Sequence, residues 1–492
     1  QKTHEFWLSF GPEATAPASD RWRSPLRVLP TPESVLGSGI SLYLLPPADG
    51  ATGSAEIHER LVAQAVRGPD TFLAKRERAD EYGWRNFGEL WADHESKYDD
   101  SGDLFVSHYN NQYDVVYGAF LQYARTGDER WIDILEPLAR HAMDIDIYHT
   151  DEDRTVYNRG LFWHTAHYVR AGLATHRSYP KGDTVGGGPD NEHNYASGFA
   201  HYYFLTGDRQ GREAAIERAQ WILDADDGDK DRRFRLLHRG PTGFASKTRE
   251  AGFHGPGRGA GNSIQVLMDA WRLTAAERFL AKAEQILRRT IHPEDDPGAM
   301  DLADSENRWS YTVHLQAVGR MLDELAEAEQ LGELYAYGRE CLLRYARWMA
   351  EHERPALDFP DRLDHPTETW AAQDLRKSEV FRYAMLHSDG EERDRFRERA
   401  EFFHHHSLET LDGFETKSYT RPVTLLLRYG LMQAYFDAHP DARRPDPQWS
   451  GSFAPRKPFV PQKAAAIRKA AWIAAGAGAV LVAGLAAYLG LR

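Results

Sequence analysis

The sequence contains very little cysteine, and several common enzyme motifs are missing from it. Cys341 is the only cysteine among the 492 residues, so the chain cannot form an internal disulfide. There is no phosphate-binding loop ending in Gly-Lys-Ser/Thr, no His-Glu-x-x-His motif and no Gly-x-Ser-x-Gly motif. The glycine-rich run at 255–261 contains a proline and lacks a strand–turn–helix context, which argues against a dinucleotide site. The usual nucleotide-binding, zinc-protease and α/β-hydrolase classes are therefore disfavoured.

Positive charge is also in short supply. The chain has 60 Lys and Arg against 74 Asp and Glu, a formal net charge of −14. Such a balance argues against nonspecific binding of nucleic acid, and we expect no nucleic-acid partner. Any acidic ligand would have to be held by a local group of cationic side chains.

What the sequence does contain is a recurring phrase. It reads His108-Tyr-Asn-Asn-Gln-Tyr-Asp114 and later Asn191-Glu-His-Asn-Tyr-Ala-Ser197, and each copy runs through an apolar, aromatic stretch to Thr-Gly-Asp. A glycine just past a helix end followed by an aspartate suits a helix stop and the N-cap of a second helix. Polar side chains therefore gather at the starts of several helices, as in a helical toroid with a polar mouth.

Apolar spacing of three and four residues predicts a series of helix pairs. We expect them at 107–125 with 128–147, 192–206 with 209–225, 260–274 with 276–291, 309–329 with 332–353, and 376–387 with 391–410, completed by 419–437, with a further helix near 160–177. The fold class is therefore mainly α, an (α/α)6-type toroid over 58–440. Residues 1–57 are expected to be the end of a β-rich domain, because His4–Phe10 resembles a strand.

The C-terminal part predicts a membrane anchor. A Pro-rich, basic linker is expected over 441–469, and 470–491 contains no charged residue and is long enough to span a bilayer. Arg456, Lys457, Lys463, Arg468 and Lys469 precede this span, which by the positive-inside rule places the large domain in the cytoplasm. The function considered below would instead place this domain in the periplasm or outside the cell, so the orientation stays open.

The candidate site is the ring of predicted inner-helix starts, where unpaired N–H groups favour anionic ligands. Its expected substrate-binding residues are His108, Asn110, Asn111, Arg159, His164, Asn191, Asn194, Tyr195, Asn262, Trp309, His314, Glu368, Trp370, Gln373 and Arg376. His, Tyr, Arg and Asn suit β-elimination from a uronate, which needs a base, a proton donor and groups that neutralise the carboxylate. We expect His193 or His254 as the base, Tyr311 or Tyr109 as the donor, and Arg258 with Arg159 on the carboxylate.

Two alternatives remain open. A glycoside hydrolase would use paired carboxylates, here Asp190 or Glu192 with Glu368 or Asp374. A non-catalytic glycan-binding envelope protein would bind oligosaccharide without turnover. No cofactor or metal site is expected, although Ca²⁺ could sit near the acidic loops at 99–103 or 224–229.

Several stretches resemble the exo-rhamnogalacturonan lyase-like family, in which a RIFT barrel precedes an α/α-toroid. They are Lys2–Phe10, Gly83-Trp-Arg-Asn-Phe-Gly-Glu89, His108–Asp114 and Gly188-Pro-Asp-Asn-Glu-His-Asn-Tyr195. The resemblance runs from residue 1 to about 440 and implies a lyase that acts on an acidic polysaccharide. The membrane span in place of a C-terminal sugar-binding module departs from the family pattern.

Overall fold

The structure, a computed structural model, describes residues 26–80, 82–162, 170, 188–230, 233–248, 250 and 252–490. Within these ranges the chain is helical, with three isolated β-bridges and no strand. The predicted strand at 4–10 and most of the predicted helix at 160–177 lie outside the described residues. The described part of the predicted β segment contains helix α2 (Pro32–Gly37) and the start of α3 (Ser54–Ala63), so the expectation of a β segment up to residue 57 is wrong there.

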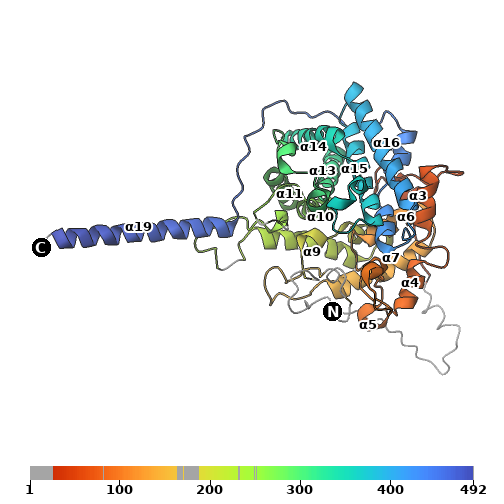
Figure 1. The fold of residues 1–492 in the computed structure, drawn as a ribbon, viewed down its shortest axis with the longest axis horizontal. Coiled ribbons are helices and arrows are strands. Elements are labelled where there is room, and N and C mark those ends of the chain that lie inside the picture. Colours follow the sequence, from red (N-terminus) through yellow and green to blue (C-terminus); the bar gives the residue numbers. More distant parts are fainter. Residues whose placement is uncertain are drawn as a thin grey trace.

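Six helices contact one another in chain order and close into a circuit. Their bounds are α6 (Val115–Thr126), α8 (Ser197–Thr206), α10 (Arg258–Thr274), α13 (Tyr311–Glu327), α15 (Glu368–Met385) and α17 (Thr420–Leu426). Each contacts the next, and α17 returns to α6. Six further helices pack outside them: α7 (Arg130–His141), α9 (Arg209–Asp226), α11 (Glu277–Thr290), α14 (Glu333–His352), α16 (Gly390–Asp412) and α3. Figure 1 shows α10, α11, α13 and α14 on one side, α3, α6 and α16 on the other, and α15 between them beside α16.

The Thr-Gly-Asp phrases act as the sequence predicts. Gly127 and Gly207 end α6 and α8 in the left-handed conformation, with φ of 67° and 74°. The carboxylate of Asp208 then caps α9 by accepting a hydrogen bond from the backbone N–H of Gln210 at 2.9 Å. The helix pairs therefore start and stop where the sequence places them, within a few residues for most.

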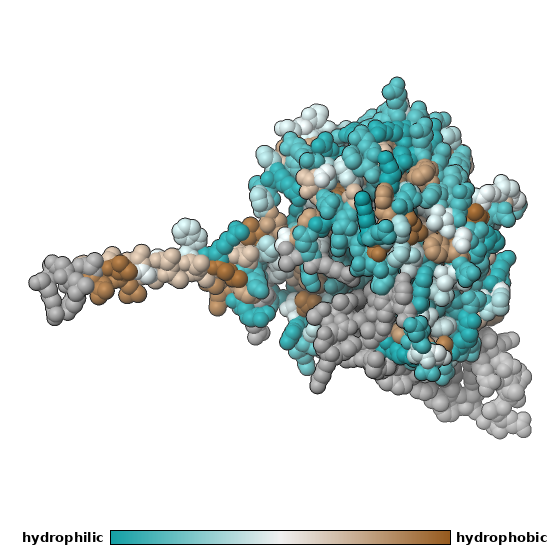
Figure 2. Space-filling model, in the orientation of Figure 1, coloured by the Kyte–Doolittle hydropathy of each residue, from teal (hydrophilic) through white to brown (hydrophobic). Residues whose placement is uncertain are grey.

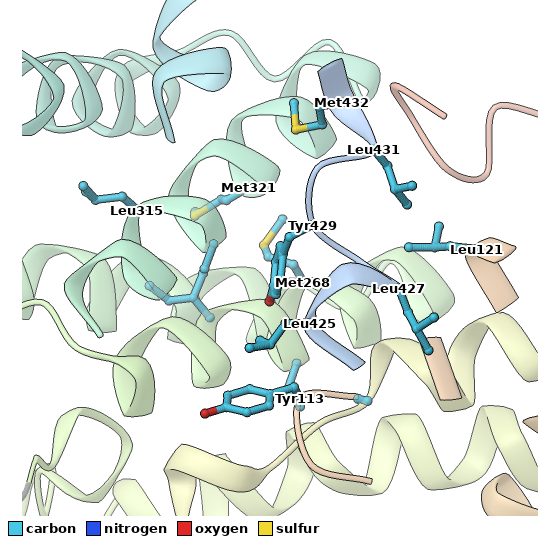
Figure 3. Close-up of a cluster of buried hydrophobic side chains, with 14 of the residues drawn as sticks. Tyr113, Leu121, Met268, Leu315, Met321, Leu425, Leu427, Tyr429, Leu431 and Met432 are labelled. Atoms are coloured by element: carbon cyan, nitrogen blue, oxygen red, sulfur yellow. The ribbon is translucent and has the colours of Figure 1, made fainter. Parts of the chain in front are cut away.

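The predicted helix at 419–437 is instead two short ones. The chain breaks after α17 at Gly430, which has a φ of 91°, and continues as α18 (Met432–Ala438). Figure 3 shows the stretch that carries Leu425, Tyr429 and Leu431 running between helices from earlier parts of the chain. The break turns the Tyr429 side chain toward the centre of the helix circuit, where it faces the site described below.

The glycine-rich run at 255–261 serves close packing between helices. A Cβ on Gly261 would lie 2.8 Å from Cα of His314, so α10 and α13 approach each other backbone to backbone at this point. A Cβ on Gly259 would likewise meet the carbonyl oxygen of Lys247 at 2.8 Å. Small residues are needed here because a larger side chain would separate the helices.

The part of the predicted linker (441–469) that precedes the last helix is fixed to the outer helices. The Arg444 guanidinium pairs with Asp323 at 2.7 Å, and the Phe453 ring packs edge-on against Tyr337. Farther along, the Arg456 guanidinium pairs with the buried carboxylate of Asp295. This stretch therefore lies along the folded body and is held by both ion pairs and aromatic packing.

The last helix, α19 (Gln462–Gly490), begins within the predicted linker and extends away from the body (Figure 1). Its first residue is buried: the Gln462 side chain donates to the carbonyl oxygen of Gly228 at 3.1 Å. Ala466 is also buried, whereas the uncharged run from Ala470 onward is largely exposed, with Trp472 79% exposed, and forms the pale to brown arm of Figure 2. Of the helices in the described ranges, this one is long and apolar enough to cross a membrane.

Candidate functional site at the helix starts

A cleft of about 880 Å³ opens at the N-terminal ends of the circuit helices. Arg258, the first residue of α10, lies on its wall, as do Trp309 just before α13 and Trp370 in the first turn of α15. Tyr113 and Gln112 come from the loop that precedes α6. The polar mouth expected from the sequence is thus present at the expected end of the helices.

A smaller cavity of about 110 Å³ lies among the circuit helices and shares Tyr113 and Arg258 with the cleft. Four arginines line this cavity: Arg258, Arg320, Arg376 and Arg428. Guanidinium groups bind carboxylates and phosphates in a bidentate manner, so this set supplies the local positive charge that the acidic chain lacks overall.

Two of these arginines form ion pairs with carboxylates, whereas Arg376 and Arg428 form none among the described residues and interact only at longer range with the Glu379 carboxyl group. The Arg258 guanidinium pairs with Glu192 at 2.6 Å, and Arg320 pairs with Asp269 and Glu324. Those pairs neutralise part of the positive charge in the cavity. The net charge that remains for a ligand must come from the other two arginines.

Arg376 and Arg428 make only neutral hydrogen bonds in the part of the chain that the structure describes. Arg376 is 2% exposed and donates to Gln373 Oε1 at 2.5 Å, Gln316 Oε1 at 3.0 Å and the hydroxyl of Tyr429 at 2.6 Å. Arg428 donates to the carbonyl oxygen of Tyr113 at 2.7 Å. A buried guanidinium without an ion pair is costly, so Arg376 carries a positive charge that an anionic ligand in the cavity could compensate.

Tyr113 occupies the junction of the cleft and the cavity in an unusual backbone conformation. Its φ is 56°, and Asn110 and Asp114 in the same loop also have left-handed φ values of 53° and 60°. Non-glycine residues adopt this region at an energetic cost that often marks a functional site. The Tyr113 hydroxyl accepts a hydrogen bond from Gln373 Nε2 at 3.0 Å, and its ring centroid lies 5.5 Å from the Arg376 guanidinium carbon.

Glu379 is the acidic residue of the inner cavity. Burial raises the pKa of its carboxyl group to about 7, although its oxygens accept hydrogen bonds from Gln316 at 2.6 Å and the backbone of Gly430 at 3.3 Å. Burial likewise raises the pKa of the Tyr195 phenol on the same cavity. Glu379 can therefore carry a proton near neutral pH, as a general acid must.

Seven of the predicted residues line the cleft or the inner cavity. They are Tyr195, Arg258, Asn262, Trp309, Trp370, Gln373 and Arg376. His193, which the sequence predicts as the base, is 3% exposed, and its Nε2 lies 3.5 Å from Arg258 Nη1. It therefore contacts the site through Arg258.

The polar residues of the recurring phrases mostly hold the loops before α6 and α8. Asn111 Oδ1 accepts from the backbone of Val116, and Asn194 and Asn191 donate to the carbonyl oxygens of Arg218 and Ala245. Asn110 donates to Asp146, and His108 is buried beside it. These side chains stabilise the loops and do not line the cleft.

The remaining predicted residues lie elsewhere. Tyr109 and His314 are buried in the core, Tyr311 donates to Glu353 at 2.5 Å, and Glu368 pairs with Lys97. His254 packs against Phe459 of the linker, and Arg159 pairs with Asp151 and Glu217 near the surface. His164 lies outside the described residues. Helix position alone could not separate these side chains from the ones that face the cleft.

The acidic residues of the hydrolase alternative are mostly engaged in the fold. Asp374 pairs with Lys377 at 2.8 Å, and burial with the Glu192 charge raises the pKa of Asp190. Of the four predicted acids, only Glu192 lines the cleft. In the two acidic loops considered for Ca²⁺, Asp99 pairs with Arg170, Asp224 with Lys230, and Asp226 with Arg289 and Lys282.

Sequence reasoning missed Tyr113, Arg320, Glu379, Arg428 and Tyr429. Tyr113 falls inside the recurring phrase and could have been found there, whereas Arg320 and Glu379 lie in mid-helix and carry no motif. It also missed three buried potential metal ligands, Glu89, His141 and Asp146.

No protein-family model and no curated protein matches the sequence.

Proposed function

We propose that the chain is a polysaccharide lyase that cleaves a uronate-containing glycan by β-elimination, built on an (α/α)6-type toroid formed by the helix circuit. The observation that carries the proposal is the pair of guanidinium groups that face the inner cavity with no ion pair to a carboxylate among the described residues, Arg376, which is buried, and Arg428, which is half-buried. A uronate carboxylate would supply the missing negative charge. The resemblance to the exo-rhamnogalacturonan lyase-like family supports the same class.

In this proposal the glycan enters through the large cleft, where Trp309 and Trp370 offer apolar faces to sugar rings. The uronate carboxylate binds Arg376 and Arg428. Neutralising that charge makes the C5 proton more acidic and stabilises the enolate-like transition state.

Tyr113 is the best-placed proton carrier for this reaction, in place of the histidines expected from the sequence. Its side chain lines both the cleft and the inner cavity, next to Arg376, where a bound uronate would present its C5 proton. Tyr113 removes the C5 proton, the electron pair forms the C4–C5 double bond, and the C4–O bond breaks. The leaving oxygen then takes a proton from the phenol, so the enzyme ends in its starting state.

Glu379 favours hydrolysis as a second candidate. Its carboxyl group holds a proton near neutral pH because of burial, as the acid of a glycosidase does, while Glu192 is paired with Arg258 and lines the cleft as a carboxylate. Water would then cleave the glycosidic bond by hydrolysis in place of β-elimination, and the product would contain no double bond.

We also propose that α19 anchors the chain in a membrane. Its apolar part is exposed over a length that matches a bilayer, and Lys463, Arg468 and Lys469 lie exposed on its first turns. Phospholipid headgroups are suitable partners for these amines. A lyase of extracellular glycan would place the toroid in the periplasm or outside the cell.

A screen of the chain against acidic and neutral polysaccharides tests the proposal. Ultraviolet absorbance of the C4–C5 double bond and reducing ends are followed together. Both signals rise for a lyase, whereas reducing ends without absorbance identify a hydrolase. Saturable oligosaccharide binding without either signal identifies a glycan-binding protein and contradicts both enzymatic proposals.

A further inference from the structure

Three potential metal ligands converge in the core beneath the loop that carries Tyr113. Glu89 follows α5 (Gly83–Asn86), His141 ends α7, and Asp146 ends the π-helical turn η2 (Ala142–Asp146). All three are fully buried, and one ligand atom from each lies within 4.8 Å of the others. A π-helical turn is rare and is often found at functional sites.

The distances between these atoms fit a metal better than a hydrogen bond. His141 Nε2 lies 3.3 Å from Glu89 Oε2 and 3.4 Å from Asp146 Oδ1. Charge-assisted hydrogen bonds between nitrogen and oxygen are shorter, at about 2.7–2.9 Å. Two ligands bound tetrahedrally to zinc by bonds of about 2.0–2.1 Å are separated by about 3.3–3.4 Å.

Each side chain is also oriented by a further hydrogen bond, as metal ligands usually are. His141 Nδ1 lies 3.1 Å from the carbonyl oxygen of Phe87, so Nδ1 donates and Nε2 is the ring nitrogen that faces the two carboxylates. Glu89 Oε1 accepts from the backbone N–H of Leu90 at 2.8 Å, and Asp146 Oδ1 accepts from Asn110 Nδ2 at 3.0 Å.

We propose that Glu89, His141 and Asp146 bind a zinc ion that braces the loop before α6. An imidazole and two carboxylates form a suitable ligand set for Zn²⁺. Asn110 connects the ion to the loop, because its side chain bonds Asp146 and its backbone N–H bonds Glu89. The ion's role is structural, because the cluster is fully buried.

A proton is the competing occupant. Zinc binds a neutral imidazole and ionised carboxylates, so protons compete for the same ligand atoms and the apparent affinity should fall as pH decreases.

Metal content of the purified full chain tests the proposal. We expect stoichiometric zinc by plasma mass spectrometry, a lower melting temperature after chelation, and recovery when zinc is restored. His141→Gln and Glu89→Gln should lose the zinc, while His314→Gln should retain it. His314 is the matched control, a fully buried histidine on α13 that contacts Thr290.

Cobalt binding to the wild-type chain tests the proposal even if the variants fail to fold. Co²⁺ added to the chelated wild-type chain should give the visible bands of a tetrahedral site, and zinc should remove them. The proposal is overturned if the wild-type chain takes up neither ion and neither ion changes its melting temperature. In that case the cluster is an imidazolium of His141 beside the two carboxyl groups. This outcome does not depend on lyase activity, so the two proposals can fail separately.

Discussion

The replacement of Arg376 by methionine should separate activity from stability. Arg376 makes three hydrogen bonds to neutral acceptors, each worth about 1.5–3 kcal/mol for a charged donor. Against them stands a desolvation cost of several kcal/mol for a buried guanidinium without a carboxylate partner. The acceptors that the variant frees face a cavity of about 110 Å³, enough for about three waters. The free energy of unfolding should therefore change by no more than about 2 kcal/mol.

Catalysis should respond much more strongly. If Arg376 binds the uronate carboxylate, its loss removes charge stabilisation from the transition state. A single preorganised donor of this kind is worth about 3–4 kcal/mol, or a fall in kcat/KM of about 10²–10³-fold. The assay is the rate of ultraviolet absorbance on the polysaccharide that the screen identifies, with urea unfolding of the same samples.

Arg382→Met is the matched control. Arg382 lies on the same helix, α15, is 2% exposed and has a neutral partner, Gln433, but it lines neither the cleft nor the inner cavity. We expect this variant to keep its activity. Equal activity losses in the two variants, or full activity in Arg376→Met, would refute the anion-binding role of Arg376.

Other predictions concern stability and membrane binding. Because burial raises the pKa of Glu379 from 4.5 to about 7, the wild type should lose about 3 kcal/mol relative to Glu379→Gln as pH rises from 5 to 8, measured by urea unfolding. Burial would raise the pKa of Asp226, but Arg289 outweighs burial and lowers this pKa to about 2. The stability advantage of the wild type over Asp226→Asn should therefore be constant above pH 5. This advantage should decrease by about 2 kcal/mol as pH falls from 5 to 2. Gly261→Ala should cost about 1–3 kcal/mol by overpacking, whereas Gly37→Ala, which has open space, should not. The full chain should enter the detergent phase of a Triton X-114 separation, and a chain without the apolar part of α19 should stay in the aqueous phase.

The helices were predictable because their signals are local. Apolar spacing and the Thr-Gly-Asp stops depend on a few neighbouring residues, so α9, α11 and α14 begin and end close to the predicted positions. Gly430 breaks the last predicted helix because it adopts a left-handed φ, and the apolar spacing on either side carries no sign of this. The apolar pattern of α19 was sufficient to predict a long exposed helix.

The site was only partly predictable, because side-chain direction depends on tertiary packing. Asn194 and Arg258 both occur at predicted helix starts. The Asn194 amide donates to a backbone carbonyl oxygen, whereas the Arg258 guanidinium faces the cleft. Arg428 follows α17 and points inward because the chain turns at Gly430. Such an orientation is decided by residues that are distant in sequence.

The docked linker determines how an anchored chain could move. A loose tether would let the folded body rotate freely above the lipid. Here Arg456 and Gln462 fix the chain that precedes the apolar run of α19 to the folded body. If α19 spans a membrane, the body would therefore keep a fixed distance and orientation over the bilayer, and its cleft would reach only molecules within a thin layer parallel to the membrane.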